Sequence, residues 1–235
     1  MVNRGFKADE IDSGTPHPAR MYDYYLGGHD NYEVDRDAAE RIIAVLPVIR
    51  EGAHENRGFR NRAVHTLVAD HGIRQIIDIG TGIPTSPNTH EIAQSAAEDT
   101  RVVYVDNDPI VGIHAQGRLM GVGQTAYVAG DIRALEAILD HPDTRALIDF
   151  TQPVAVLLVA LLHFVTDAED PGDIVARLRE KLPAGSFIVI SHATRDRAEP
   201  AMFDSLAELT EVYKHATASL SLRTYDEVQD RKSVV

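Results

Sequence analysis

The stretch from residue 77 to 85, IDIGTGIPT, combines residue types that bind nucleotides at the end of a β-strand. Gly80 and Gly82 form a Gly-x-Gly turn, in which the backbone can approach a ligand because no side chain obstructs it. A dinucleotide loop would have a third glycine where this chain has Thr85. Asp78 places a carboxylate just ahead of the turn. Because a carboxylate repels a pyrophosphate and attracts an ammonium group, the loop favours a cationic ligand. The alternative is a tight strand-to-helix connection without a ligand.

Two further aspartates follow the next two apolar runs. Asp106, in YVDNDP, lies close to the offset of about 20 residues at which an acidic side chain reaches ribose hydroxyls, although a solvated loop aspartate is the alternative. Asp131, in AGDI, can accept a hydrogen bond from an adenine amino group, with Ile132 against the ring. Its alternative role is to cap the helix that begins at Arg133. Sites for an ammonium group, a ribose and an adenine at three successive strand ends describe S-adenosylmethionine.

The elements that must position these residues alternate along the chain. Short apolar runs predict strands, and the amphipathic stretches between them predict helices, a pattern that indicates an α/β doubly wound parallel sheet with a Rossmann-like arrangement. Such sheets bind ligands beyond the carboxyl ends of their strands, where the winding reverses. The predicted strands are 75–79, 101–105, 125–129, 154–159 and 186–190, and the predicted helices between them are 87–97, 109–120, 133–140 and 170–182.

The two ends of the chain differ from this alternating region. Two helices, 35–46 and 53–70, precede the first strand, and a helix over 199–216 follows the last. The usual last two strands of such a fold are missing, so we expect the terminal segment or another subunit to cover the exposed edge of the sheet. We therefore predict a disordered tail over 1–18, an N-terminal helical lid over 19–72, a Rossmann-like domain over 73–218 and a C-terminal segment over 219–235.

Composition excludes several classes of function. The net charge of −13 leaves no broad basic surface, which disfavours nucleic acid as a partner. The chain has no cysteine, which removes thiolate metal sites and thiol nucleophiles. No apolar run is long enough to cross a bilayer and no signal-peptide pattern is present, so we expect a cytoplasmic protein without a membrane partner.

Several segments together resemble one known family. The chain is similar to the class I methyltransferases that use S-adenosylmethionine, and more narrowly to the actinobacterial S-adenosyl methyltransferase family, formerly a domain of unknown function. The resemblance covers most of residues 19 to 218. The segments that carry it are RMYDYYLGGHDNYEVDRDAAE (20–40), HENRGFRNRAV (54–64), IRQIIDIGTGIPTSPNTHEIAQ (73–94), RVVYVDNDPIV (101–111), LLVALLHFVTDAEDP (157–171) and SFIVISHAT (186–194).

The resemblance implies S-adenosylmethionine as the cofactor and a role for each matching position. Arg57 would pair with the methionine carboxylate, and its alternative role is that of a solvated helix arginine. The methionine side of the cofactor would be held by Asp78, Gly80 and Gly82, the ribose by Asp106, and the adenine by Asp131 and Ile132. Thr81 and Asn107 would be further cofactor-binding residues, and Tyr22, Gly28, Asn56 and Arg57 would close over the cofactor from the N-terminal helices.

The chemistry of methyl transfer needs an aligned nucleophile more than an acid or a base, because the donor carries its own leaving group. His163, at the end of the fourth predicted strand, is the candidate catalytic residue and can take a proton from the acceptor; a structural, hydrogen-bonded histidine is the alternative. His192 has a weaker claim of the same kind. We predict no metal site. The absence of an Asn-Pro-Pro-Tyr motif favours a small-molecule acceptor.

Three functions remain in competition. The leading one is a methyltransferase that acts on a small molecule. The second is a degenerate or truncated relative that binds S-adenosylmethionine or S-adenosylhomocysteine without catalysis, which the missing strands favour. An NAD-dependent oxidoreductase is the third, and Asp78 together with the missing third glycine argues against it.

Overall fold

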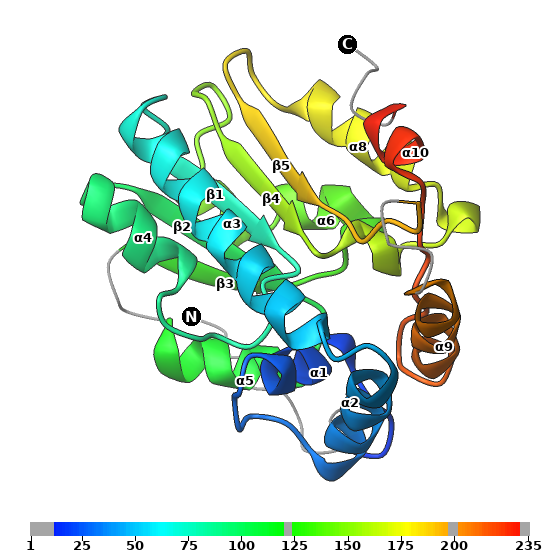
Figure 1. Ribbon diagram of the computed structural model, residues 1–235. Helices are drawn as coiled ribbons and strands as arrows, with labels where there is room; N and C mark the ends of the chain where they lie inside the picture. Colours follow the sequence, from blue (N-terminus) through cyan, green and yellow to red (C-terminus); the bar gives the residue numbers. More distant parts are fainter. Residues whose placement is uncertain (1–11, 120–123, 197–201, 231–235) are drawn as a thin grey trace.

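The computed structural model describes residues 12–119, 124–196 and 202–230 of the chain. A parallel sheet of five strands in the order β3-β2-β1-β4-β5 forms its centre. This arrangement confirms the predicted α/β doubly wound sheet (Figure 1). The strands are β1 (Gln75–Ile79), β2 (Arg101–Asp106), β3 (Thr125–Ala129), β4 (Ala155–Val159) and β5 (Phe187–Ser191), each within one residue of its predicted bounds.

Helices cover both faces of the sheet and each face has its own apolar core. Branched aliphatic residues dominate the strands, as expected where a strand is buried on both sides. One core packs the sheet against α6 (Leu135–Leu139) and α8 (Pro171–Lys181). The other packs it against α3 (Ile49–Ala69), α4 (Thr89–Ala96) and α5 (Pro109–Arg118). A short helix, α7 (Pro142–Leu147), precedes β4.

The winding of the chain reverses beside β1. From β1 the chain proceeds outward to β2 and β3, then returns to the other side of β1 for β4 and β5. The connections that follow β1 and β4 therefore leave the sheet in opposite directions. A crevice at the carboxyl ends of these two strands is the expected place for a ligand in this class of sheet.

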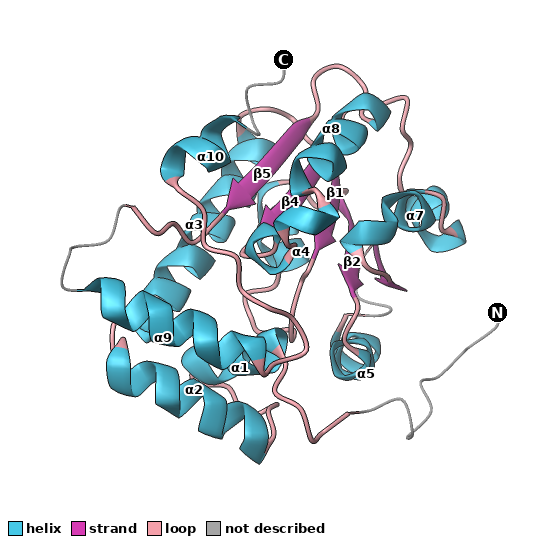
Figure 2. Cartoon of the chain, turned by 90° about the vertical axis from the view of Figure 1, so that its right-hand side faces the viewer, coloured by secondary structure: helices cyan, strands magenta, loops and turns pink. Residues whose placement is uncertain are grey.

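Within the part of the chain that the structure describes, three helices precede β1, so the prediction of two was wrong. α1 (Pro18–Tyr25) begins with proline at its first position, and the side chain of His17 accepts a hydrogen bond from the backbone N–H of Ala19. α2 (Glu33–Val45) and α3 follow. α1 and α2 share a third apolar core with α9 (Phe203–Lys214), a helix from the other end of the chain. Figure 2 shows these helices side by side below the sheet.

The segment just before α1 is packed against the rest of the molecule, although we predicted a tail up to residue 18. The backbone N–H of His17 donates to Asp35 on α2 at 2.9 Å. The carbonyl of Pro16 accepts a hydrogen bond from Thr217, which follows α9. Residues 1–11 lie outside the described residues, and the other domain boundaries remain predictions.

β5 forms one edge of the sheet, and among the described residues it pairs with β4 alone. Within the described residues no strand follows it, and the chain continues into α9, α10 (Tyr225–Asp230) and their connection. That connection touches the segment beyond β5 at an isolated parallel bridge between Thr194 and Arg223. The terminal segment thus contacts the end of β5 without extending the sheet, and association through this edge remains a prediction. No helix in the described part of the chain is long and apolar enough to span a membrane.

Candidate binding site

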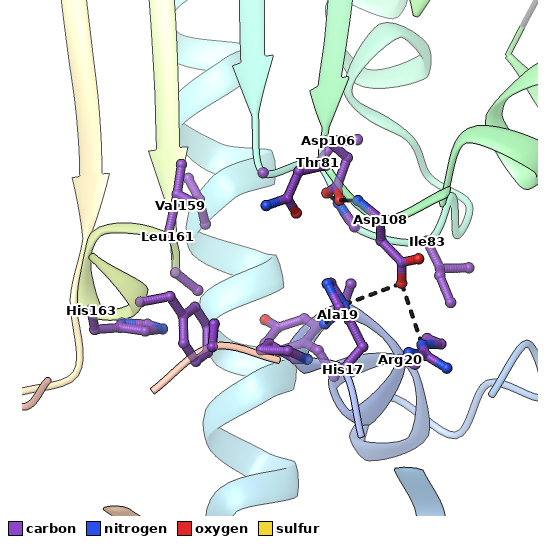
Figure 3. A pocket seen from close by; sticks show the side chains of 18 of the residues that line it. His17, Ala19, Arg20, Thr81, Ile83, Asp106, Asp108, Val159, Leu161 and His163 are labelled. Atoms are coloured by element: carbon purple, nitrogen blue, oxygen red, sulfur yellow. Dashed lines mark hydrogen bonds and ion pairs between the residues drawn. The ribbon is translucent and has the colours of Figure 1, made fainter. Parts of the chain in front are cut away.

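A cavity of about 650 Å³ lies at the carboxyl ends of the strands, between the sheet and helices α1, α3 and α9. Its volume falls within the range of ligand pockets in proteins, about 300–1,000 Å³. Figure 3 shows Asp106 and Asp108 at one side of the cavity and Val159, Leu161 and His163 at the other. Apart from Gly28, every site residue predicted from the sequence lines this cavity.

The loop after β1 turns into the cavity because two of its residues are glycines in the left-handed region. Gly80 has φ of +72° and Gly82 has φ of +67°. The N–H groups of Gly80 and Thr81 both donate to the carbonyl of Val105 on β2, which fixes the loop. A Cβ on Gly80 would lie 2.7 Å from Leu161, so only glycine leaves room for that side chain. The loop can therefore present bare backbone to a ligand.

Asp106 lies at the end of β2, directly behind this loop, and its side chain is 5% exposed. One carboxylate oxygen accepts the N–H of Gly82 at 2.8 Å, and the other accepts the N–H of Asp108 at 3.0 Å. Burial raises the pKa of Asp106 to about 6. Because each carboxylate oxygen has a further lone pair, Asp106 keeps the capacity to accept hydrogen bonds from a ligand.

Asp78 and two arginines of α3 bring opposite charges to the same part of the cavity. Asp78 is buried, and the hydroxyl of Thr89 donates to its Oδ2 at 2.6 Å. Burial raises the pKa of Asp78, whereas Arg60 and Arg57 oppose this rise. Burial lowers the pKa of Arg57 to about 10, so its guanidinium stays charged at neutral pH. It donates to the carbonyl of Thr85 at 3.2 Å. This part of the cavity is suited to a zwitterion.

Tyr22 and Asn56 join α1 to α3 at the cavity wall. The hydroxyl of Tyr22 donates to the carbonyl of Ala53 at 2.9 Å and accepts the side-chain amide of Asn56 at 3.0 Å. The predicted association of these two residues at one site is therefore seen in the structure, since both line the cavity.

At the end of β3, Asp131 makes the capping contact that was the alternative to adenine binding. Its Oδ1 accepts the N–H of Arg133 at 2.9 Å, the start of a 3₁₀ turn over Ile132–Ala134. The guanidinium of Arg133 pairs with the same carboxylate at 2.8 Å, and Asn107 donates to it at 2.9 Å. Asp131, Asn107 and Ile132 all line the cavity, so capping and ligand binding remain compatible.

His163 lies in a 3₁₀ turn, Leu162–Phe164, that follows β4. The chain enters this turn through Ala160, whose φ of +53° costs a residue with a side chain about 1 kcal/mol. The hydroxyl of Ser191 accepts the N–H of Ala160 at 2.9 Å and helps to hold this conformation. Burial lowers the pKa of His163 to about 3, so the ring is neutral at pH 7.

Gly28 does not line the cavity, in contrast to the prediction that it contacts the cofactor. Instead it allows the backbone to pass close to Asp23, because a Cβ at residue 28 would lie 2.1 Å from the Asp23 carboxylate. That carboxylate is 4% exposed and accepts hydrogen bonds from Asp30 and from Asn31, so it has little freedom to move. Asp23 itself lines the cavity.

Gly28→Ala should therefore destabilise the protein by about 2 kcal/mol, as overpacked interior positions do. The midpoint of thermal unfolding measures this loss. Gly117→Ala is the matched control, since Gly117 is an exposed residue of α5 with no atom within 4 Å of an added Cβ. Equal midpoints for the two variants would contradict the contact with Asp23.

Sequence reasoning did not find a buried charged cluster that lines the cavity beside Asp106. Arg20 of α1 lies between Asp35 at 3.4 Å and Asp108 at 3.3 Å. The His17 ring nitrogen lies 3.1 Å from Asp108, and Figure 3 shows both His17 and Arg20 beside Asp108. Arg20, Asp35 and Asp108 are at most 3% exposed. Proline after His17 could have indicated the start of α1. Nothing in the sequence pattern indicates that an arginine of that helix is buried.

No group of histidine and acidic side chains in the described part of the chain has the geometry of a metal site. The absence of a metal site therefore stays a prediction.

The parallel sheet, its strand order and a cavity at the strand ends define the class I methyltransferase fold. The plantazolicin methyltransferase BpumL, solved in complex with S-adenosylhomocysteine, has this fold: 13% identity, 91% of this chain and 72% of that chain covered, and a TM-score of 0.50. At such low identity the likeness concerns the fold alone. A search of the curated proteins gave no significant match.

Two solved structures are much more similar. A putative methyltransferase from Thermobifida fusca YX is 36% identical over 97% of this chain and 83% of its own, with a TM-score of 0.88. A DUF574 family protein from Streptomyces avermitilis MA-4680 is 44% identical over 95% of this chain and 84% of its own, with a TM-score of 0.89. The sequence model of the S-adenosyl methyltransferase family matches residues 4–231. The chain belongs to this family, which confirms the resemblance and, at the level of the family, S-adenosylmethionine as the cofactor.

Proposed function

We propose that this protein is an enzyme that transfers a methyl group from S-adenosylmethionine to a small molecule. The observation that carries the proposal is the order of side chains along the cavity. Asp131, Asp106 and Asp78 belong to the ends of three adjacent strands, β3, β2 and β1, whereas His163 follows β4. An adenosine with an attached amino acid fits along the ends of β3, β2 and β1, which leaves the end of β4 for the methyl acceptor.

The residues present fit the chemical groups of this cofactor. Asp106 would accept hydrogen bonds from the ribose hydroxyls, because its carboxylate is held in place by two backbone N–H groups. Asp78 and Arg57 carry the charges that complement an α-ammonium and an α-carboxylate. Asn107 and Ile132 would contact the adenine, and Gly80 to Gly82 would approach the methionine through their backbone. The cofactor would supply a methyl group on a positively charged sulfur.

A diphosphate cofactor such as NAD fits these residues poorly. Asp78, Asp106 and Asp108 are all buried carboxylates close to the loop that would receive the pyrophosphate. These negative charges lie in a partly dry cavity, where electrostatic repulsion is weakly screened, so they raise the free-energy cost of binding a diphosphate. The acidic wall therefore supports a cofactor whose reactive centre is a cation.

A binding protein without catalysis is the second candidate. The observation that favours it is that, within the described residues, no strand after β5 contributes to the wall of the cavity. Against it, α9 and the segment after it supply residues to the cavity, including Leu209, Tyr213 and Leu220. These residues close the cavity next to the end of β4.

Calorimetric titration tests the proposal at the level of the cofactor. We expect S-adenosylmethionine and S-adenosylhomocysteine to bind with micromolar affinity and NAD not to bind. Binding of NAD alone would overturn the proposal. Transfer of a labelled methyl group to candidate small molecules then separates an enzyme from a binding protein.

A cytoplasmic location and an acceptor other than nucleic acid complete the proposal. The first rests on the lack of an apolar run long enough to cross a bilayer, and the second on the net charge of −13. Association of two copies through the free edge of β5 is part of the same proposal, and sedimentation of the purified protein would measure it.

A further inference from the structure

Most charged side chains of the cavity lie around the ends of β1, β2 and β3. Around the ends of β1, β2 and β3, aspartates and arginines alternate on the wall. Around the end of β4 lie six apolar or aromatic lining residues, which come from α1, from the segment just after β4, from α9 and from the segment after α9: Tyr25, Leu161, Phe164, Leu209, Tyr213 and Leu220. We call these six residues the apolar chamber. Figure 3 shows His163 on the same side of the cavity as Leu161, opposite Asp106.

The ring of His163 is oriented by a backbone group. Its Nδ1 accepts the N–H of Ala193 at 3.4 Å, so the single proton of the neutral ring lies on Nε2. Among the described residues Nε2 has no hydrogen-bond partner. His163 is 7% exposed and is one of the residues that line the cavity. His163 therefore offers the cavity a hydrogen-bond donor, whereas a general base would need a free lone pair there.

The groups around His163 keep it in this state. His192 follows β5, and its ring lies 5.3 Å from that of His163. Arg223, from the segment after α9, pairs with Asp167 and donates to Nε2 of His192 at 3.0 Å. After burial, His192 and Arg223 are the further causes that lower the pKa of His163. Protonation of His163 would bring a positive charge close to the guanidinium of Arg223 and the ring of His192, which is unfavourable.

His192 cannot act as the base in its place. Since the guanidinium of Arg223 can only donate, Nε2 of His192 accepts, and Nδ1 carries the proton and donates to the carbonyl of Ala193 at 2.7 Å. Both ring nitrogens are therefore engaged. Among the described residues of the apolar chamber, none is an acid or a base with a pKa near neutrality.

The apolar chamber also contains a buried hydroxyl without a hydrogen bond. Tyr25 is 2% exposed, and its hydroxyl has no partner in hydrogen-bond geometry among the described residues. Burial raises its pKa, and Tyr213 raises it further, so the two phenols are neighbours. Burial raises the pKa of Tyr213 to about 12. Both hydroxyls stay protonated at neutral pH, and they lie close enough for each to shift the pKa of the other.

From these contacts, and on the basis of the proposed function, we propose that the methyl acceptor is an aromatic molecule with an acidic phenolic hydroxyl, bound as its phenolate with the oxygen facing Nε2–H of His163. Aromatic and aliphatic walls favour a flat, apolar body. The Nε2–H of His163, which would face the reacting atom, favours an oxygen anion as the nucleophile. An amine would instead place its own N–H opposite the N–H of His163. An aliphatic alcohol would need the base that the chamber lacks.

The transfer step balances without a protein base. The phenol loses its proton to water before or during binding. The phenolate oxygen then forms the new bond to the methyl carbon, and the electron pair of the broken carbon–sulfur bond stays on the sulfur, which becomes neutral. The products are a methyl ether and S-adenosylhomocysteine. His163 keeps its proton throughout and acts as a donor to the attacking oxygen.

An optical titration tests this assignment with 4-nitrophenol, whose phenolate absorbs visible light. The protein is first saturated with S-adenosylhomocysteine, and calorimetry confirms that the nucleoside binds. We expect the complex to bind the phenolate roughly tenfold more tightly than the neutral phenol, as expected for a hydrogen bond to a charged oxygen. The apparent pKa of bound 4-nitrophenol then falls by about one unit.

Two variants separate a donor from a base. His163→Gln places an amide N–H near the position of Nε2 and cannot act as a base, so it should retain most of the shift. His163→Ala should lose it. Both variants should bind S-adenosylhomocysteine as the parent protein does, which shows that they are folded. An equal loss in both variants, or an undiminished shift in the alanine variant, would contradict the proposal.

A comparison that needs no variant uses 4-nitroaniline, which has the same shape and carries an amine. It should bind at least tenfold more weakly than the phenolate. Equal or tighter binding of the aniline overturns the phenol assignment but leaves the cofactor proposal intact. Failure of S-adenosylhomocysteine to bind would overturn the proposed function itself, so the two failures can be distinguished.

Discussion

Asp106→Asn should weaken the binding of S-adenosylhomocysteine roughly 100-fold, or by about 3 kcal/mol, in a calorimetric titration at pH 7.5. The carboxylate of Asp106 accepts backbone N–H groups from Gly82 and Asp108 on separate oxygens. An amide of the same shape must turn its NH₂ group toward one of these N–H groups. The variant therefore loses the charge that would meet the ribose and disturbs the loop that would meet the methionine.

The same carboxylate predicts how binding depends on pH. Burial raises the pKa of Asp106 to about 6 without a ligand. Because the ionised form is the one that accepts hydrogen bonds from two hydroxyls, affinity is full above pH 6 and falls by up to tenfold per unit below it. Asp78, whose pKa is also raised, acts in the same direction. The contribution of Asp106 to the pH dependence of binding is the difference in that dependence between the parent protein and the Asp106→Asn variant.

Asp149→Asn is the matched control for this substitution. Asp149 is exposed, lies outside the cavity and accepts hydrogen bonds from Thr151. Its variant should bind S-adenosylhomocysteine as the parent protein does. A loss of less than fivefold in Asp106→Asn, with its thermal midpoint preserved, would remove Asp106 from the ribose site.

Arg20→Met should lower the free energy of unfolding by about 4 kcal/mol, the largest loss of stability that we expect from one substitution. Arg20 is 2% exposed and lies between the carboxylates of Asp35 and Asp108. Without the guanidinium, two buried acids face each other with no compensating charge. For a chain of this size the midpoint of thermal unfolding should fall by about 10 °C.

Arg50→Met provides the comparison. Arg50 pairs with Glu40 at 3.1 Å, but its side chain is 44% exposed and that of Glu40 is 53% exposed. An exposed pair contributes at most about 1 kcal/mol, so the midpoint should change little. Asp35→Asn in the Arg20→Met background should restore part of the loss, since it removes one uncompensated charge. A fall of less than 2 °C in Arg20→Met would show that the cluster is not stabilising.

The sheet could be predicted from the sequence because its signal is local. A strand buried on both faces has an uninterrupted apolar run, and β4 follows this pattern. The similar run in β5 also suggested a central strand, but β5 forms an edge of the sheet and is only half-buried. Because the strands were predicted, the positions of site residues near their ends, such as Asp78 and Asp106, were predicted as well. α1 was missed because its sequence, PARMYDYY, is short and mixes charged with aromatic residues.

The remaining features depend on contacts between distant segments. The burial of Arg20 requires Asp108, which follows β2, and Asp35, which lies on α2. Gly28 resembled a ligand-binding glycine, but its role depends on the position of Asp23. The role of Arg223 in orienting His192 could not be inferred either, because the two residues meet only when the segment after α9 returns to the end of β5.

The bridge between Thr194 and Arg223 has a consequence for how the family can diversify. The walls on either side of the cavity come from different stretches of the gene: the nucleoside side from β1 to β3, and much of the apolar chamber from α9 and the segment that ends at Arg223. Substitutions in that later stretch can alter which molecules are accepted without altering the methyl donor. Selection can therefore act on substrate range and on cofactor affinity as two nearly independent traits.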